Sequence, residues 1–492
     1  MSLTKKIAYN TISQIGGKIL STILSLFSLA LITRYLGPNG FGEYTIILTF
    51  LGFFAVFADF GLTLVTVQLI SDKTRNEAKI LNNLFSLRLI SILAFLALAP
   101  LVAIFLPYSA TIKLGLMIAI AAFIFPALNQ IIIGLFQKKL CMEKSAIAEV
   151  LSKLFLLIGI LLSEKLNLGL NGVLLATSFS ALSSFLIHYL FSLKFACIKL
   201  EWDFSLWKEV FIKFWPLAVT IILSLVYLRA DTLILSFFKT TEEVGYYGAP
   251  YKVIDVLTSL PFMFAGLILP ILTTSYLEKK YQDFKKVLQK SLDYIIITAI
   301  PLVVGTILVS KEIILLIAGP GFGPSVLILQ ILIFSLLAIF PGTILTHAVI
   351  AIDKQKKMIP FYLFTSLSSL LAYLILIPKF SYYGAAAVTI YSEILIAFFA
   401  TYCILKYTDF KFALKKSLLA ILSGLAMAVF IFFFKIICPI GSSTLSIVGL
   451  LKLGLLIISS AIIYLSILFI TGGLERNDLT LITQKKYEKY QK

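Results

Sequence analysis

The chain has 492 residues, of which 60% are hydrophobic and only 13% are charged, and its mean hydropathy is +1.02. Roughly a quarter of the residues in a soluble globular protein are charged, so this composition excludes an ordinary soluble domain. The net charge is +18, but the lysines stand in short loops between apolar runs, which argues against nucleic-acid binding.

Fourteen apolar runs, most of them long enough to cross a bilayer as a helix, follow one another along the chain. They cover residues 12–33, 44–70, 80–106, 112–136, 146–163, 170–193, 211–236, 249–272, 292–317, 324–350, 358–377, 383–405, 415–437 and 445–470. Because the runs are continuous and do not alternate, they exclude a membrane β-barrel. We therefore predict an all-α, polytopic membrane protein with about fourteen transmembrane helices.

The basic residues predict the orientation of these helices. The alternate loops that include both termini hold 29 lysines and arginines, and the other loops hold 7. Because basic loops stay in the cytoplasm, we predict a multi-pass protein of the cytoplasmic membrane with both termini inside the cell.

Two similar interruptions of the apolar pattern indicate an internal repeat. RYLGPNGFGEY, at residues 34–44, resembles FKTTEEVGYYGAPY, at residues 238–251, and both stand between apolar runs. Three further landmarks recur in the same order at an offset of about 200 to 215 residues. An even number of helices in each copy predicts a parallel repeat and a cleft between two bundles, as in transporters. We predict six-helix bundles at 1–200 and 201–408, with two more helices and a basic cytoplasmic tail at 409–492. The repeated glycines fit tight turns.

LITRYLGPNGFGEY, followed by ADFGL, resembles the first helical hairpin of the polysaccharide-biosynthesis flippases, members of the multidrug/oligosaccharidyl-lipid/polysaccharide exporter superfamily. The stretch YLRADTLILSFFKTTEEVGYYGAPYKV, at residues 227–253, is similar to the helix 7–8 signature of that family. The resemblance implies a flippase that moves a polyprenyl-linked oligosaccharide to the outer leaflet by alternating access. The lipid II flippases are relatives with arginines in their first helix, whereas STILSLFSLAL here is uncharged and rich in serine.

Ionisable residues inside the spans mark candidate functional positions, because each is costly to insert into a membrane. In the first copy these residues are Lys18, Asp59, Arg88 and Lys153, all predicted in the inner half. A lipid-linked sugar carries a phosphate or pyrophosphate, so we predict that Lys18, Arg88 and Lys153 bind it, together with Arg229. Asp59 is assigned to coupling or gating, with a structural pair to Lys18 as the alternative.

The second copy supplies the remaining candidates for coupling or gating, which are Asp231, Lys252, Asp255 and Glu393. Arg229 with Asp231 or Asp255 is also a candidate structural pair between helices. Glu393 lies within a span, so it is a candidate for binding a coupling ion, either a proton or sodium.

Two other functions stay open from the sequence. One is a cation-coupled exporter of drugs or small organic molecules, which the excess of cations over carboxylates in the spans disfavours. The other is an integral-membrane glycosyltransferase or polymerase, which needs a general acid or base and usually a sizeable soluble loop. The four cysteines lack CxxC or metal-ligand spacing. We therefore predict a transporter that is not an enzyme, without cofactor or metal, whose partners are its lipid-linked substrate and membrane lipids, and which is a monomer.

Overall fold

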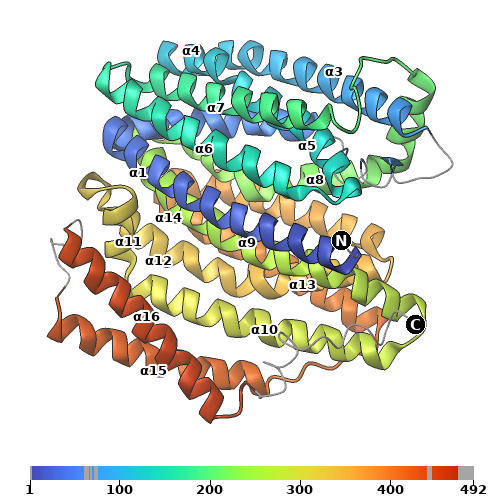
Figure 1. Ribbon diagram of the computed structural model, residues 1–492. Helices are drawn as coiled ribbons and strands as arrows, with labels where there is room; N and C mark the ends of the chain where they lie inside the picture. Colours follow the sequence, from blue (N-terminus) through green and yellow to red (C-terminus); the bar gives the residue numbers. More distant parts are fainter. Residues whose placement is uncertain are drawn as a thin grey trace. The chain divides into compact units, whose positions relative to one another are not determined.

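The computed structural model describes residues 3–59, 62, 66, 69–70, 76–439 and 446–474, and every regular element in these ranges is helical (Figure 1). The α-helices are α1 (Leu3–Phe57), α3 (Glu77–Ile104), α4 (Ala110–Ala119), α5 (Ala121–Lys139), α6 (Met142–Lys165), α7 (Gly169–Ser192), α8 (Phe204–Phe238), α9 (Thr241–Leu277), α10 (Tyr281–Leu308), α11 (Ser310–Ile317), α12 (Ser325–Leu332), α13 (Leu336–Ala351), α14 (Ile359–Tyr407), α15 (Lys415–Ile437) and α16 (Ile447–Ile470). Short 3₁₀ turns lie at Pro320–Phe322, Ile333–Ser335 and Gln355–Met358. The predicted all-α class is confirmed.

Within the described ranges, 12 helical segments are long and apolar enough to cross a membrane. Two of them bend sharply, α1 at Gly37 with φ 65° and α14 at Ser381 with φ 51°. The 55 residues of α1 would extend about 80 Å as one straight helix, whereas the hydrocarbon core is about 30 Å thick. If each half of α1 and of α14 crosses once, the segments make the predicted fourteen crossings.

Gly37 explains the first bend, because glycine adopts a positive φ without strain and Pro38, which follows it, has no N–H to continue the helical pattern. The basic loop at 71–75 and the tail at 475–492, which contribute to the predicted orientation, lie outside the described residues. The orientation and the division at residues 200 and 408 stay predictions.

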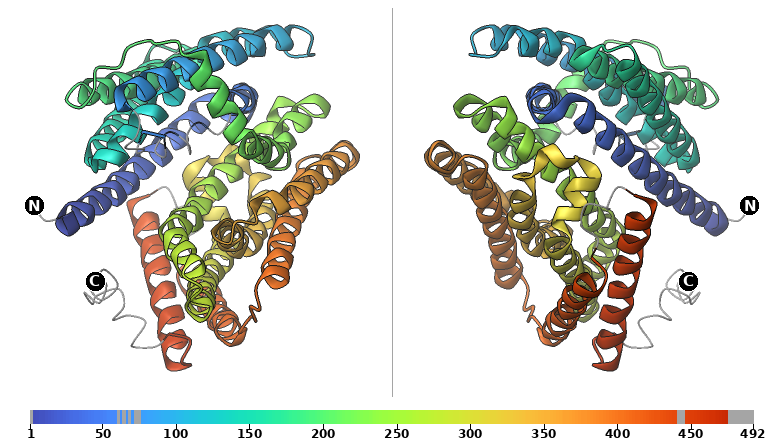
Figure 2. Two further views of the ribbon diagram at one scale, coloured as in Figure 1. Left: turned by 90° about the vertical axis from the view of Figure 1, so that its right-hand side faces the viewer. Right: turned by 90° about the vertical axis from the view of Figure 1, so that its left-hand side faces the viewer.

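The described residues form two compact units. The first contains the chain up to residue 249 with 317–322 and 362–389, and the second contains 250–316, 323–361 and the chain from residue 390. In the first unit α6 packs between α1 and α7, α5 packs on α7 and α3, and α8 packs on α1. In the second unit α10 packs on α13 and α15. Figures 1 and 2 show α15 and α16, orange to red, side by side in this second unit.

The two C-terminal helices are attached to α10 and α11 by polar contacts as well as by apolar packing. Lys435 of α15 forms an ion pair with Glu312 at 2.7 Å and donates a hydrogen bond to the Leu308 carbonyl at 2.9 Å. Tyr464 of α16 donates to the Ile297 carbonyl at 2.8 Å. Because the Glu312 side chain is only 7% exposed, its charge depends on Lys435.

Within the first unit the repeated glycine stretches meet each other. A Cβ on Gly42 would overlap the Thr241 carbonyl of α9, and a Cβ on Gly245 would overlap the Pro38 carbonyl of α1. Gly42 therefore faces Thr241, four residues before Gly245, and Gly245 faces Pro38, four residues before Gly42. Only residues without a side chain permit this approach. Thr241 also donates a hydrogen bond to Asn39. The turn predicted here is confirmed at Gly37, whereas Gly42 and Gly245 serve a helix crossing.

The linker between α7 and α8 lies along the start of α3 in an extended conformation. Alternate backbone N–H groups, those of residues 199, 201 and 203, donate to the side chains of Asn82, Ser86 and Asn83 at 3.0, 2.9 and 2.7 Å. Asp203 forms an ion pair with Lys79 at 2.7 Å and accepts the first N–H groups of α8. The linker therefore sets where α8 begins.

Candidate functional site

The first candidate site lies beside a close contact between α1 and α6. A Cβ on Gly17 would lie 2.5 Å from the Ala146 Cβ, so glycine at this position allows close contact between the two helices. Lys18, the next residue, consequently stands beside the turn of α6 that carries Glu149.

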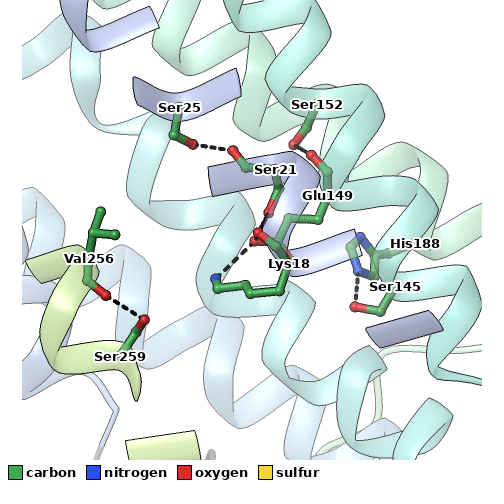
Figure 3. Close-up of polar contacts among 9 residues, drawn as sticks. All are labelled: Lys18, Ser21, Ser25, Ser145, Glu149, Ser152, His188, Val256 and Ser259. Carbon is green, nitrogen blue, oxygen red and sulfur yellow. Dashed lines mark hydrogen bonds and ion pairs between the residues drawn. The ribbon is translucent and has the colours of Figure 1, made fainter. Parts of the chain in front are cut away.

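Lys18 and Glu149 form the charged centre of this site. The Lys18 ammonium lies 3.1 Å from Glu149 Oε1, and the two side chains are 48% and 37% exposed (Figure 3). Ser21 donates to the same Glu149 oxygen at 3.2 Å. An ion pair that faces water is worth only about 0–1 kcal/mol, so in a water-filled site an incoming anion would displace Glu149 from Lys18 at little cost.

Serines continue this polar site along both helices. Ser25 donates to the Ser21 carbonyl at 2.8 Å, and Ser152 donates to the Glu149 carbonyl at 2.8 Å (Figure 3). Lys153 is half-buried one turn after Glu149, on the same face of α6. This lysine, Lys18 and Glu149 together give the site one net positive charge.

The histidine nearest this site is satisfied within the protein. His188 of α7 donates from Nδ1 to the Ser184 carbonyl at 2.8 Å, which leaves Nε2 to accept from the Ser145 hydroxyl at 3.1 Å (Figure 3). This arrangement fits a neutral ring that fixes α6 against α7.

Arg88 and Asp59 form a buried ion pair where α1 ends. Arg88 Nη1 lies 2.5 Å from Asp59 Oδ1, with side chains 5% and 16% exposed. The guanidinium also donates to the carbonyls of Ala58 at 3.3 Å and Ala127 at 3.2 Å. The structure therefore pairs Asp59 with Arg88, and Lys18 with Glu149, in place of the Lys18–Asp59 pair considered above. Substrate binding by Arg88 stays a prediction.

Asp231 lies in a hydrogen-bonded cluster in the first unit. Its carboxylate is fully buried and accepts from the Tyr247 hydroxyl at 2.6 Å, from the Thr232 N–H at 2.6 Å and from the Thr389 hydroxyl at 3.4 Å. Tyr373 donates to the Tyr227 carbonyl at 2.9 Å beside this cluster. Helices α8, α9 and α14 thus contribute hydroxyl groups around one buried carboxylate. Arg229, two residues before Asp231, is half-buried.

The second unit holds the other three candidates. Lys252 lies 3.9 Å from Asp255 on the next turn of α9, which is a loose and partly exposed pair. Glu393 of α14 is buried, and it forms no ion pair with any residue that the structure describes. The predicted pairing of Arg229 with Asp255 joins residues of different units and stays a prediction.

Several residues of these sites were not singled out from the sequence. Glu149 lies within an apolar run, one turn before Lys153, and its charge alone marks it as costly to insert. The hydroxyl groups of Tyr247 and Thr389 gave no such signal, because tyrosine and threonine are common in spans.

Comparison with known proteins completes this description. The sequence model of a family described as polysaccharide biosynthesis protein matches residues 3–276, more than half of the chain. The chain is 24% identical over 373 residues to the capsular polysaccharide biosynthesis protein CapF of Staphylococcus aureus, covering 75% of this chain and 91% of that protein. It is 26% identical over 372 residues to a putative O-antigen transporter of Shigella flexneri, covering 70% and 85%. The fold is similar to that of the lipid II flippase MurJ in an inward closed conformation, with a TM-score of 0.74, 19% identity, and coverage of 93% and 100%.

Proposed function

We propose a specific transport function for this chain, which belongs to the polysaccharide biosynthesis protein family: it moves a polyprenyl-linked oligosaccharide from the cytoplasmic to the outer leaflet of the cell membrane by alternating access. The observation that carries the proposal is the family match over residues 3–276. The relatives named for capsular polysaccharide and O-antigen support a glycan as the cargo. The match to MurJ supports the fold, since the two sequences are only 19% identical.

Lys18 is the residue that we assign to first contact with the substrate phosphate. Its ammonium is half-exposed within an apolar span, and its partner Glu149 also accepts from Ser21. When a phosphate replaces Glu149, the ammonium exchanges one oxygen anion for another and the carboxylate keeps the serine hydrogen bond. Lys153, on the same face of α6, adds a second cation for a pyrophosphate.

The substrate assignment is tested by removing one charge. We expect Lys18→Ala to reduce surface glycan strongly while the amount of folded protein in the membrane stays unchanged, because an exposed ion pair contributes little to stability. Lys113→Ala is the matched control, because Lys113 is half-buried and donates only to the Ile104 carbonyl of the adjoining helix. Both glycan and folded protein are measured for each variant. Normal glycan in Lys18→Ala would contradict the assignment.

For energy coupling we propose Asp231 and Glu393 as the ion-binding carboxyl groups. Asp231 is surrounded by hydroxyl groups, and Glu393 is buried in the second unit. In vesicles with an imposed proton or sodium gradient, Asp231→Asn or Glu393→Gln should remove the response to the gradient and leave slow, gradient-independent transport. A full response in both variants would exclude these residues as the coupling site.

A further inference from the structure

The linker before α8 and the first turns of that helix hold all the tryptophans of the chain. The sequence contains 3 tryptophans, and these are Trp202, Trp207 and Trp215. Tryptophan concentrates at the boundary between membrane and water, where the ring lies among headgroups. The 35 residues of α8 extend about 52 Å, and the apolar run predicted in this part of the chain covers residues 211–236. Trp202 and Trp207 therefore lie just before this run and Trp215 about one turn inside it, which is where residues of a membrane interface are expected.

A groove opens at this level of the first unit. It has a volume of about 290 Å³ and is lined by Leu62, by Leu87 of α3 and by one face of α8 that includes Trp207, Phe211 and Trp215. The side chains of Phe211 and Trp215 are more than half exposed. Among the described residues that line the groove, only Lys208 is charged, and it is also exposed.

The walls of the groove decide what it can hold. They are almost entirely apolar, so the hydroxyl groups of a sugar would lose hydrogen bonds to water without replacement. The volume is at the small end for ligand pockets, which are about 300–1,000 Å³, and it suits part of a hydrocarbon chain. A chain placed here has its headgroup at the interface, where Lys208 can meet an anionic phosphate.

We propose that this groove is a binding site for an anionic phospholipid, with one acyl chain between α3 and α8 and the phosphate at Lys208. The linker fixes the position of the groove, because Trp207 donates from Nε1 to the Asn83 carbonyl at 3.2 Å and Asp203 holds the start of α8. The lipid therefore joins α3 to α8, which are also joined by the linker contacts.

Tryptophan fluorescence reports on this groove directly. The reporter protein is Trp202→Phe, which keeps Trp207 and Trp215, the two tryptophans that line the groove. It is reconstituted in phosphatidylcholine vesicles in two series. One series contains rising fractions of phosphatidylglycerol brominated on its acyl chains, and the other contains rising fractions of phosphatidylcholine brominated in the same way. Bromine quenches tryptophan fluorescence on contact. We expect brominated phosphatidylglycerol to give the same quenching at a fraction about fivefold lower than brominated phosphatidylcholine requires. A fivefold preference is what one lysine near a membrane surface supplies for an anionic lipid.

Three variants decide the outcome. Lys208→Gln should abolish the preference, whereas Lys199→Gln, the same charge change on the linker away from the groove, should keep it. Ala218→Phe, which fills the groove, should reduce quenching while the unquenched emission spectrum stays unchanged. The proposal is overturned if the two lipids quench equally or if the preference for phosphatidylglycerol survives Lys208→Gln. It is also overturned if Lys199→Gln loses this preference to the same extent as Lys208→Gln, or if quenching is undiminished in Ala218→Phe. If polyprenyl phosphate relieves the quenching by brominated phosphatidylglycerol and unlabelled phosphatidylglycerol does not, the groove belongs to the substrate carrier. That result would overturn the proposal as well.

Discussion

Replacing Asp59 by asparagine separates architecture from substrate binding at the C-terminal end of α1. Arg88 is 5% exposed and keeps its charge in every condition compatible with folding, so it needs an anion beside it. The 2.5 Å contact with Asp59 supplies that anion, and the two backbone carbonyls supply only partial charges. Asp59→Asn removes the counter-charge and leaves the guanidinium buried.

The size of the effect follows from this environment. Breaking a buried ion pair by removing one partner costs about 3–5 kcal/mol. Because two carbonyls still accept from Arg88 and Asp59 is 16% exposed, we expect the low end, about 3 kcal/mol. Replacing both residues, as in Asp59→Leu with Arg88→Met, removes both charges and should cost less than the sum of the two single changes.

The assay measures thermal unfolding of purified protein in detergent and the yield of folded protein in the membrane. Asp59→Asn and Arg88→Met should each lower both quantities, the double variant should recover part of the loss, and Lys18→Ala should lower neither. Surface glycan per folded molecule is measured in parallel. The structural role of this pair would be refuted if Asp59→Asn kept full thermal stability and still lost surface glycan. It would also be refuted if the loss of stability in the double variant equalled the sum of the losses in the two single variants.

Three further outcomes follow from the contacts described above. Gly245→Ala should destabilise the first unit by about 1–3 kcal/mol, because the added Cβ would overlap a carbonyl oxygen. Gly266→Ala on the same helix places its Cβ in open space, so it should be neutral or stabilising by about 0.5–1 kcal/mol. Equal thermal midpoints of the two variants would contradict this. Lys435→Met should lower the thermal midpoint by leaving Glu312 buried without its cation, and Glu312→Gln in the same chain should restore part of it; an unchanged midpoint in the single variant would exclude the role of this pair. The hydrogen bond from Lys79 holds the pKa of Asp203 below its ordinary value. The contact between Asp203 and Lys79 is therefore kept at neutral and mildly acidic pH and is lost only as the pH falls below about 4. Tryptophan fluorescence measures the release of the linker, and a transition near pH 6 would be inconsistent with this contact.

Much of the fold could be predicted because a membrane leaves few choices. Run length and continuity identify spanning helices, since backbone polar groups in lipid must bond within the segment. Gly37 and Pro38 likewise marked the bend of α1, because their preferences are local.

Pairing between side chains could not be predicted in the same way. Asp59 stood at a plausible depth for Lys18, and only the packing of α3 beside the end of α1 brings Arg88 to it. Asn82 and Asn83 hold the linker before α8, a role that no pattern in the sequence indicates. Such contacts depend on which helices become neighbours, and the pattern of apolar runs does not contain that information.

The crossing of Gly42 with Gly245 bears on the origin of the chain. The two glycines stand at equivalent places of the predicted repeat, and each meets the carbonyl oxygen at the equivalent position of the other predicted copy. Such reciprocity is the mark of an isologous interface, in which one surface recognises itself across a twofold axis. A single ancestral six-helix chain could have made this contact with a second molecule of itself. Gene duplication and fusion would then have placed both halves of that homodimer contact in one polypeptide.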